Sequence, residues 1–81
     1  MVNTADFKQW LSENTTYSHA VISDIASRAK RADSILEFYN DELYLFYLEK
    51  QILYQELSVS VRSQIKKAVK LYFEYSDNKR G

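Results

Sequence analysis

Residues 58–75 decide the fold class, because their apolar side chains recur at the three- and four-residue spacing of an α-helix. The stretch reads SVSVRSQIKKAVKLYFEY. Its apolar stripe is formed by Val61, Ile65, Ala68, Val69 and Tyr72. Ser58 or Ser60 is suited to cap the first turn, and the helix is expected to extend to about Tyr75. The pattern therefore predicts one long amphipathic helix near the end of the chain.

Two helices are expected at the start of the chain. The first covers about Ala5–Ser12 and is capped by Asn3, whose side chain suits a helix N-terminus. The second begins after a cap at Ser18. It is predicted to break near Ala32–Asp33, with a continuation through residues 34–36 left open because no glycine or proline marks the end.

A third helix is expected over about residues 41–50, with a continuation through Gln55 left open. Its apolar residues cover most of the circumference. One side carries Leu43, Phe46, Tyr47 and Lys50, and another carries Leu45, Leu48 and Ile52. A helix with this pattern is either central to a bundle or has a second partner on its far side.

The composition of the 81 residues agrees with these helices. The chain has no proline and a single glycine, Gly81, so it lacks the residues that most often break helices or form tight hairpin turns. A chain of this length forms one domain. We therefore expect residues 1–81 to form one compact, all-α bundle of four helices, with room for one extra helical turn. Residues 1–4 and 76–81 are expected to fray.

The sequence carries little that points to catalysis. It has no cysteine and only one histidine, His19, which disfavours a protein-only metal site or a histidine-based triad. No phosphate-binding glycine loop or nucleophile motif is present. We expect no enzymatic activity, cofactor, metal or small-molecule substrate. No apolar stretch approaches the ~20 residues of a membrane helix, so we expect no membrane partner. The absence of cysteine suits a reducing compartment, so a cytoplasmic location is expected.

Charge is unevenly distributed although the formal net charge is zero. Residues 1–32 carry a balance of +1, residues 33–56 a balance of −5 and residues 57–81 a balance of +4. The chain therefore has an acidic middle and a basic end. A basic end favours contact with phosphates, since bound phosphates release their counterions.

Two segments resemble the SAM-like core-binding domain that precedes the catalytic domain of tyrosine recombinases and phage integrases. Residues 18–31 resemble the second helix of that domain, with a capping serine, an apolar pair and then basic residues. Residues 57–75 look like its last helix, which carries bases and ends in aromatics. Phe7, Trp10 and Leu11 fit its opening helix.

The resemblance implies an orthogonal, SAM-like bundle of four helices that grips DNA without cutting or joining it, because the recombinase catalytic domain is lacking. The bases that match by position are Arg28, Lys30, Arg31, Arg62, Lys66, Lys67 and Lys70. Weak binding to duplex DNA is expected. The alternative for this basic flank is a solvated face that makes no contact.

A different class of function is also open. The acidic middle is rich in tyrosine, which is enriched at protein interfaces. Under this alternative, the chain is a small protein-interaction module that docks through its acidic middle, either as a homodimer or as a phage-type inhibitor of another protein. The candidate interface residues are Tyr39, Tyr44, Tyr47 and Tyr54.

Overall fold

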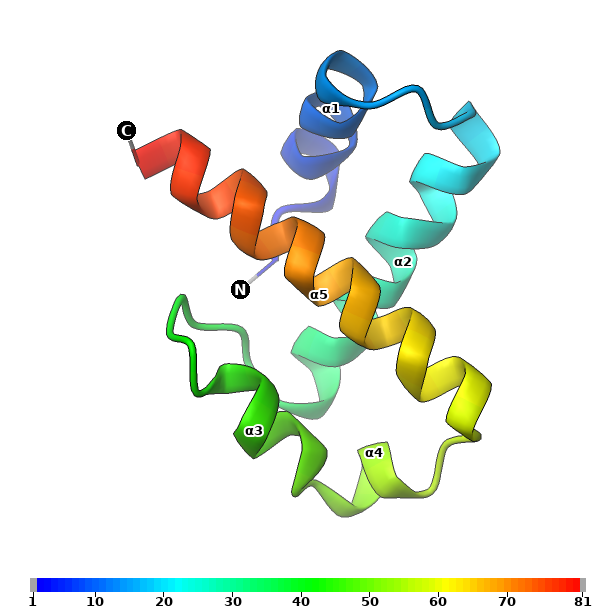
Figure 1. The fold of residues 1–81 in the computed structure, drawn as a ribbon, viewed down its shortest axis with the longest axis vertical. Helices are drawn as coiled ribbons and strands as arrows, with labels where there is room; N and C mark the ends of the chain where they lie inside the picture. The colour runs from blue at the N-terminus through cyan, green and yellow to red at the C-terminus, as the bar shows by residue number, and fades with distance from the viewer. Residues whose placement is uncertain (1, 81) are drawn as a thin grey trace.

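The computed structural model describes residues 2–80, which form five helices and no strand. The helices are α1 (Thr4–Asn14), α2 (His19–Ile35), α3 (Tyr44–Glu49), α4 (Ile52–Gln55) and α5 (Val59–Arg80). The prediction of an all-helical chain is confirmed, and α4 is a single turn added to the four helices expected. The two longest helices, α2 and α5, pack together, and α1 packs on both. Figure 1 shows α5 crossing α2, with α1 at one end of the molecule and α3 and α4 at the other.

Side-chain caps fix where the three longer helices begin. The Asn3 side chain accepts a hydrogen bond from the Asp6 amide at 3.1 Å, and Ser18 Oγ accepts one from the Val21 amide at 3.3 Å. Ser58 Oγ accepts from the amide three residues ahead at 3.2 Å. Each cap satisfies an amide that has no partner within its helix. The predicted caps at Asn3 and Ser18 are confirmed, and Ser58 rather than Ser60 makes this bond at the start of α5.

The second helix does not break near Ala32–Asp33, so that prediction is wrong. Ala32 is buried, and its carbonyl accepts a hydrogen bond from the Leu36 amide at 2.9 Å. The Asp33 carboxylate accepts from the Phe38 amide at 2.8 Å, which holds the chain where it turns away. The end of α2 is therefore set by a bond across five residues rather than by a breaker residue.

The predicted third helix is two helices, α3 and α4, separated at Lys50–Gln51. Lys50 and Gln51 donate to carbonyls three residues back, at 3.1 Å each, which tightens and ends α3. In one continuous helix, Tyr54 would lie about 120° around the axis from the buried Leu48. The break instead lets the Tyr54 ring enter the core, where it is 3% exposed. Burial of this ring explains a break that no glycine or proline marks.

The last helix continues to Arg80, so the predicted end near Tyr75 is wrong. The Asn40 side-chain Nδ2 donates to Ser76 Oγ at 3.0 Å and to Asp77 Oδ1 at 3.1 Å, and these bonds join the last turns to the α2–α3 connection. Fraying at both ends stays a prediction, and of the residues concerned Met1 and Gly81 lie outside the described part of the chain.

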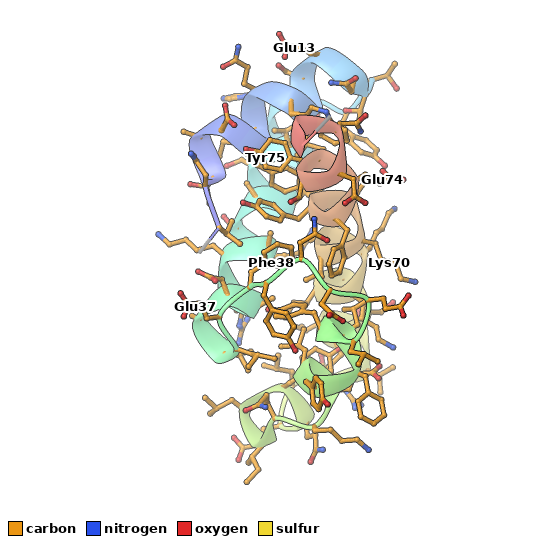
Figure 2. The ribbon with its side chains drawn as sticks, turned by 90° about the vertical axis from the view of Figure 1, so that its left-hand side faces the viewer. Glu13, Glu37, Phe38, Lys70, Glu74 and Tyr75 are labelled. Carbon is orange, nitrogen blue, oxygen red and sulfur yellow. The ribbon has the colours of Figure 1, made fainter. Side chains whose placement is uncertain are left out.

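The core consists of two clusters of buried side chains. The α1 cluster contains Phe7, Leu11, Ile22, Ile25, Ala26, Ala29, Ala68, Tyr72 and Tyr75. The α3–α4 cluster contains Ala32, Tyr44, Leu48, Tyr54, Ile65 and Val69. Phe38 packs against both clusters, with its ring centroid 4.7 Å from that of Tyr72 and 5.1 Å from that of Tyr44. Figure 2 shows Phe38 in the middle of the molecule, below Tyr75.

Aromatic side chains fill much of this core, and several tyrosine hydroxyls bind the backbone. The Tyr44 hydroxyl donates to the Leu36 carbonyl at 2.6 Å, and the Tyr54 hydroxyl donates to the Arg62 carbonyl at 3.0 Å. Trp10 lies half-buried at the edge of the α1 cluster. Its ring centroid is 6.4 Å from that of Phe7 and 5.9 Å from that of Tyr75.

Candidate functional site

A groove of 240 Å³ lies between α2 and α5. It is lined by Tyr17, Val21, Ile25, Arg28, Gln64, Lys67 and Ala68. Its floor includes the buried Ile25 and Ala68, and its polar side chains are those of Tyr17, Arg28, Gln64 and Lys67. Among the described residues, none that lines this groove is acidic. Two cations and two neutral hydrogen-bonding groups therefore meet over an apolar floor.

Helix geometry brings the two cations together. Arg28 lies two turns after Val21 and one turn after Ile25, so all three lie along the same edge of α2. Lys67 directly precedes the buried Ala68, on the side of α5 that packs against α2. Arg28 is half-buried and Lys67 is exposed. Within the described part of the chain, neither forms an ion pair. Both charges remain free to meet an anion.

Lys66 and Arg62, two of the predicted bases on α5, lie on the side of α5 that faces α3 and α4 rather than the α2–α5 groove. The Lys66 ammonium forms an ion pair with the Glu49 carboxylate of α3. The hydrogen bond to Glu49 raises the pKa of Lys66. The Nε atom of Arg62 is buried without a hydrogen-bond partner. Arg62, Lys66 and Lys70, which helical spacing places in one line, therefore do not form a flank of uniformly free cations. The exposed Lys66–Glu49 ion pair contributes little to stability, so Lys66 can leave it readily.

The remaining predicted bases are spread around the molecule. Lys70 is exposed, and Figure 2 shows it on the outer side of α5 near Glu74. Lys30 is exposed about 160° around α2 from Arg28, on the opposite edge. Arg31 lines a separate hollow of 390 Å³ that it shares with Glu56 and Leu53. Of the seven predicted bases, only Arg28 and Lys67 line the α2–α5 groove.

The four candidate interface tyrosines fall into two pairs. Tyr44 and Tyr54 are in the core, 0% and 3% exposed, and burial raises the pKa of both phenols. They are not available to a partner in this conformation, which corrects their assignment as surface contacts. Tyr39 and Tyr47 are 40% and 47% exposed. A role for these two at an interface stays a prediction.

An exposed apolar surface accompanies Tyr47, and we call it the α3–α4 apolar face. It consists of Leu43, Phe46, Tyr47, Ile52 and Leu53. The sequence signalled it, because the third predicted helix is apolar nearly all round. What the sequence did not identify is that Tyr17, from the α1–α2 connection, lines the groove between α2 and α5.

The other features of the described residues add no second candidate for nucleic acid. A hollow of 460 Å³ between α1 and the end of α5 is lined in part by Asp6 and Glu13, which repel phosphate. In residues 2–80 no three metal-ligating side chains gather as they would around an ion. Of the helices in that range, none has the length and apolarity to cross a membrane. His19 is exposed at the start of α2.

Comparison of the chain with protein-family models, with curated proteins and with solved structures gives no match.

Proposed function

We propose that this chain is a non-catalytic DNA-binding module that contacts the DNA backbone through the α2–α5 groove. The observation that carries the proposal is the convergence of Arg28 and Lys67, from two helices far apart in sequence, on one groove whose lining includes no acid among the described residues. Two cations that flank a narrow groove suit the charge of a phosphate, and their binding releases counterions. The Tyr17 hydroxyl and the Gln64 amide supply further hydrogen bonds of the kind made to phosphate oxygens.

The arrangement proposed for the fold is the SAM-like bundle of the integrase core-binding domains. Under that proposal α1, α2, α3 and α5 correspond to the four helices of those domains, and α4 is the additional turn. The segments that carry the resemblance, residues 18–31 and 57–75, include most of α2 and the first part of α5. These are the two helices that border the groove.

Binding is expected to be weak and sensitive to salt. The chain has no net charge, and the Asp24 and Glu74 carboxylates lie one turn from Arg28 and Lys70 on the same helices. A dissociation constant on the order of micromolar or higher at physiological salt is therefore expected. Specificity for one DNA sequence is expected to be low, because phosphate contacts carry no sequence information.

The proposal is tested by titrating a labelled duplex with the protein at two salt concentrations and following fluorescence anisotropy. Arg28→Ala and Lys67→Ala are each expected to weaken binding similarly across unrelated duplexes and to lower the salt slope by about one. Lys30→Ala is the matched control, because it removes the same charge from the opposite edge of α2. It is expected to change the affinity by less than about twofold.

Two outcomes would contradict the proposal. One is the absence of salt-dependent binding to duplex DNA even at low ionic strength. The other is an equal loss for Lys30→Ala and Arg28→Ala, which would show a general attraction rather than contact in the groove. Far-ultraviolet circular dichroism of each variant establishes that the helices are intact.

A further inference from the structure

All five side chains of the α3–α4 apolar face are about half exposed or more. Ile52 and Leu53 are 72% and 62% exposed, and Leu43, Phe46 and Tyr47 are about half exposed. With roughly 200 Å² of surface per large side chain, the exposed area is on the order of 600 Å². That value is at the upper end of the largest apolar patches found on monomeric proteins. Leu43, Phe46 and Tyr47 share one side of α3, and an exposed apolar area of this size marks a contact site.

The charges near this face are arranged along α3. Asp41 and Glu42, both exposed, lie just before the N-cap residue of α3, and Glu42 also lines a hollow with Leu45 and Phe73. Lys50 directly follows its last residue, and the Lys50 ammonium lies 4.9 Å from the centroid of the Phe46 ring. At about 100° per residue, Lys50 points to the same side of α3 as Phe46. The face thus has negative charge at one end and positive charge at the other.

A surface with opposite charges at its two ends is complementary to itself when a second copy is turned by 180°. In a two-fold dimer each residue contacts the same patch of the other subunit, and two α3 helices then run antiparallel. The midpoint of the exposed side of α3 lies between Phe46 and Tyr47, so these rings would meet near the two-fold axis. In that register, Lys50 of one protomer lies beside Glu42 of its partner, twice in each dimer.

We propose that a second copy of this chain covers the α3–α4 apolar face, in a two-fold dimer with antiparallel α3 helices. Two such faces bury on the order of 1,200 Å², at the lower limit of stable interfaces. A dissociation constant on the order of 10 µM is therefore expected. The dimer does not depend on the proposed DNA contact, because no residue of this face lines the α2–α5 groove.

A partner with a basic amphipathic helix is the other occupant that the acidic segment suggests. Such a partner would match Asp41 and Glu42, but it would place a base against Lys50 at the other end of the face. The second copy satisfies both ends. The two occupants differ in one measurable consequence, since only the second copy makes association depend on the concentration of this protein alone.

The test is the oligomeric state of the full chain, measured by sedimentation equilibrium from about 1 µM to about 500 µM. The unmodified chain is expected to pass from monomer to dimer in this range. Phe46→Ser is expected to raise the dimer dissociation constant by more than about thirtyfold, as at a central aromatic contact. Since Phe46 is 52% exposed, the variant is expected to keep its helical circular dichroism spectrum.

Charge reversal tests the antiparallel register. Glu42→Lys places like charges together at both ends of α3, as does Lys50→Glu, and each is expected to raise the dissociation constant by about tenfold or more. The double variant Glu42→Lys/Lys50→Glu restores both pairs, so it is expected to dimerise within about threefold of the original chain. Lys30→Glu, on α2, reverses one charge away from the face and is the matched control.

Three results would overturn the proposal. A monomer throughout the concentration range would exclude the second copy and leave a different protein as the occupant. If the double variant dimerises no more tightly than either single variant, the antiparallel register would be excluded. A loss of dimer in Lys30→Glu equal to that in Lys50→Glu would show that the association involves another surface.

Discussion

Phe38→Ala is expected to weaken both halves of the core, because Phe38 is packed against both the α1 cluster and the α3–α4 cluster. The Phe38 ring makes edge-on contacts with Tyr72 at 4.7 Å and Tyr44 at 5.1 Å between centroids, and a tilted contact with Phe73 at 5.2 Å. Alanine removes all three contacts and leaves a space that the surrounding rings fill only in part.

The size of the effect follows from burial and ring contacts. Replacing a fully buried phenylalanine by alanine costs about 3–5 kcal/mol. Phe38 is half-buried, which lowers that value, but each aromatic contact adds about 0.5–1.5 kcal/mol beyond the area buried. A loss of about 3 kcal/mol is expected, from a total stability of about 4–12 kcal/mol for a chain of this length. The melting temperature is then expected to fall by about 12–24 °C.

The assay is thermal and urea unfolding followed by circular dichroism at a protein concentration of about 1 µM, below the expected dimer range. Phe46→Ala is the matched control, because the same side chain is removed from a position that is 52% exposed. It is expected to lower the free energy of unfolding by less than about 1 kcal/mol. Equal losses in the two variants would refute the reasoning, since Phe38 would then not join the two clusters.

Two further predictions concern the same core. Ile65→Asp places a carboxylate at a position that is 0% exposed, and it is expected to unfold the chain, as seen by loss of the helical circular dichroism signal; a folded variant would mean that Ile65 does not face the core. Burial raises the pKa of Tyr44 above its ordinary value of about 10, so the folded chain keeps a proton that the unfolded chain loses at alkaline pH. The contribution of Tyr44 to the free energy of unfolding is therefore expected to be full below pH ~10 and to fall above it by up to about 1.4 kcal/mol per pH unit. Urea unfolding of Tyr44→Phe should show a shallower fall with pH. Unchanged stability of the original chain at pH ~11 would contradict this.

The starts of α1, α2 and α5 and the main apolar faces were predictable from sequence because they depend on neighbouring residues, whereas α3, which has no side-chain cap, begins at Tyr44 rather than near residue 41. A serine or asparagine cap acts within three residues, as at Asn3, Ser18 and Ser58. The stripe predicted for the last helix is also largely correct, with Ile65 and Val69 buried. Such local patterns contain the information needed to place a helix and its buried side.

The boundaries that sequence reasoning placed wrongly depend on distant contacts. The end of α2 is held by Asp33 and the Phe38 amide, and the last turns of α5 are joined to Asn40. The gap between α3 and α4 accompanies burial of Tyr54, whose hydroxyl binds the Arg62 carbonyl. None of these bonds follows from residue type and spacing alone, because each requires the path of the chain to be known.

In the candidate site, too, sequence reasoning succeeded for features set by neighbouring residues and failed for those set by distant contacts. Helical spacing placed Lys66 on a basic flank, but spacing alone does not reveal that Glu49 of a different helix is its partner. Likewise, four tyrosines in one segment look alike in sequence, and only the fold separates the buried Tyr44 from the exposed Tyr47. Arg28 and Lys67 line the same groove only because α2 and α5 cross where they do.

The position of Trp10, the single tryptophan of the chain, gives the α1 cluster an optical signal of its own. Its indole packs against Phe7 and Tyr75, so its fluorescence reports on the α1 cluster. Buried tyrosines lie in both clusters, Tyr72 and Tyr75 in the α1 cluster and Tyr44 and Tyr54 in the α3–α4 cluster, so tyrosine near-ultraviolet absorption reports on the whole core. If one half opens first, emission and absorption midpoints separate along the same urea gradient. The native sequence therefore reports the cooperativity of its own unfolding without an added label.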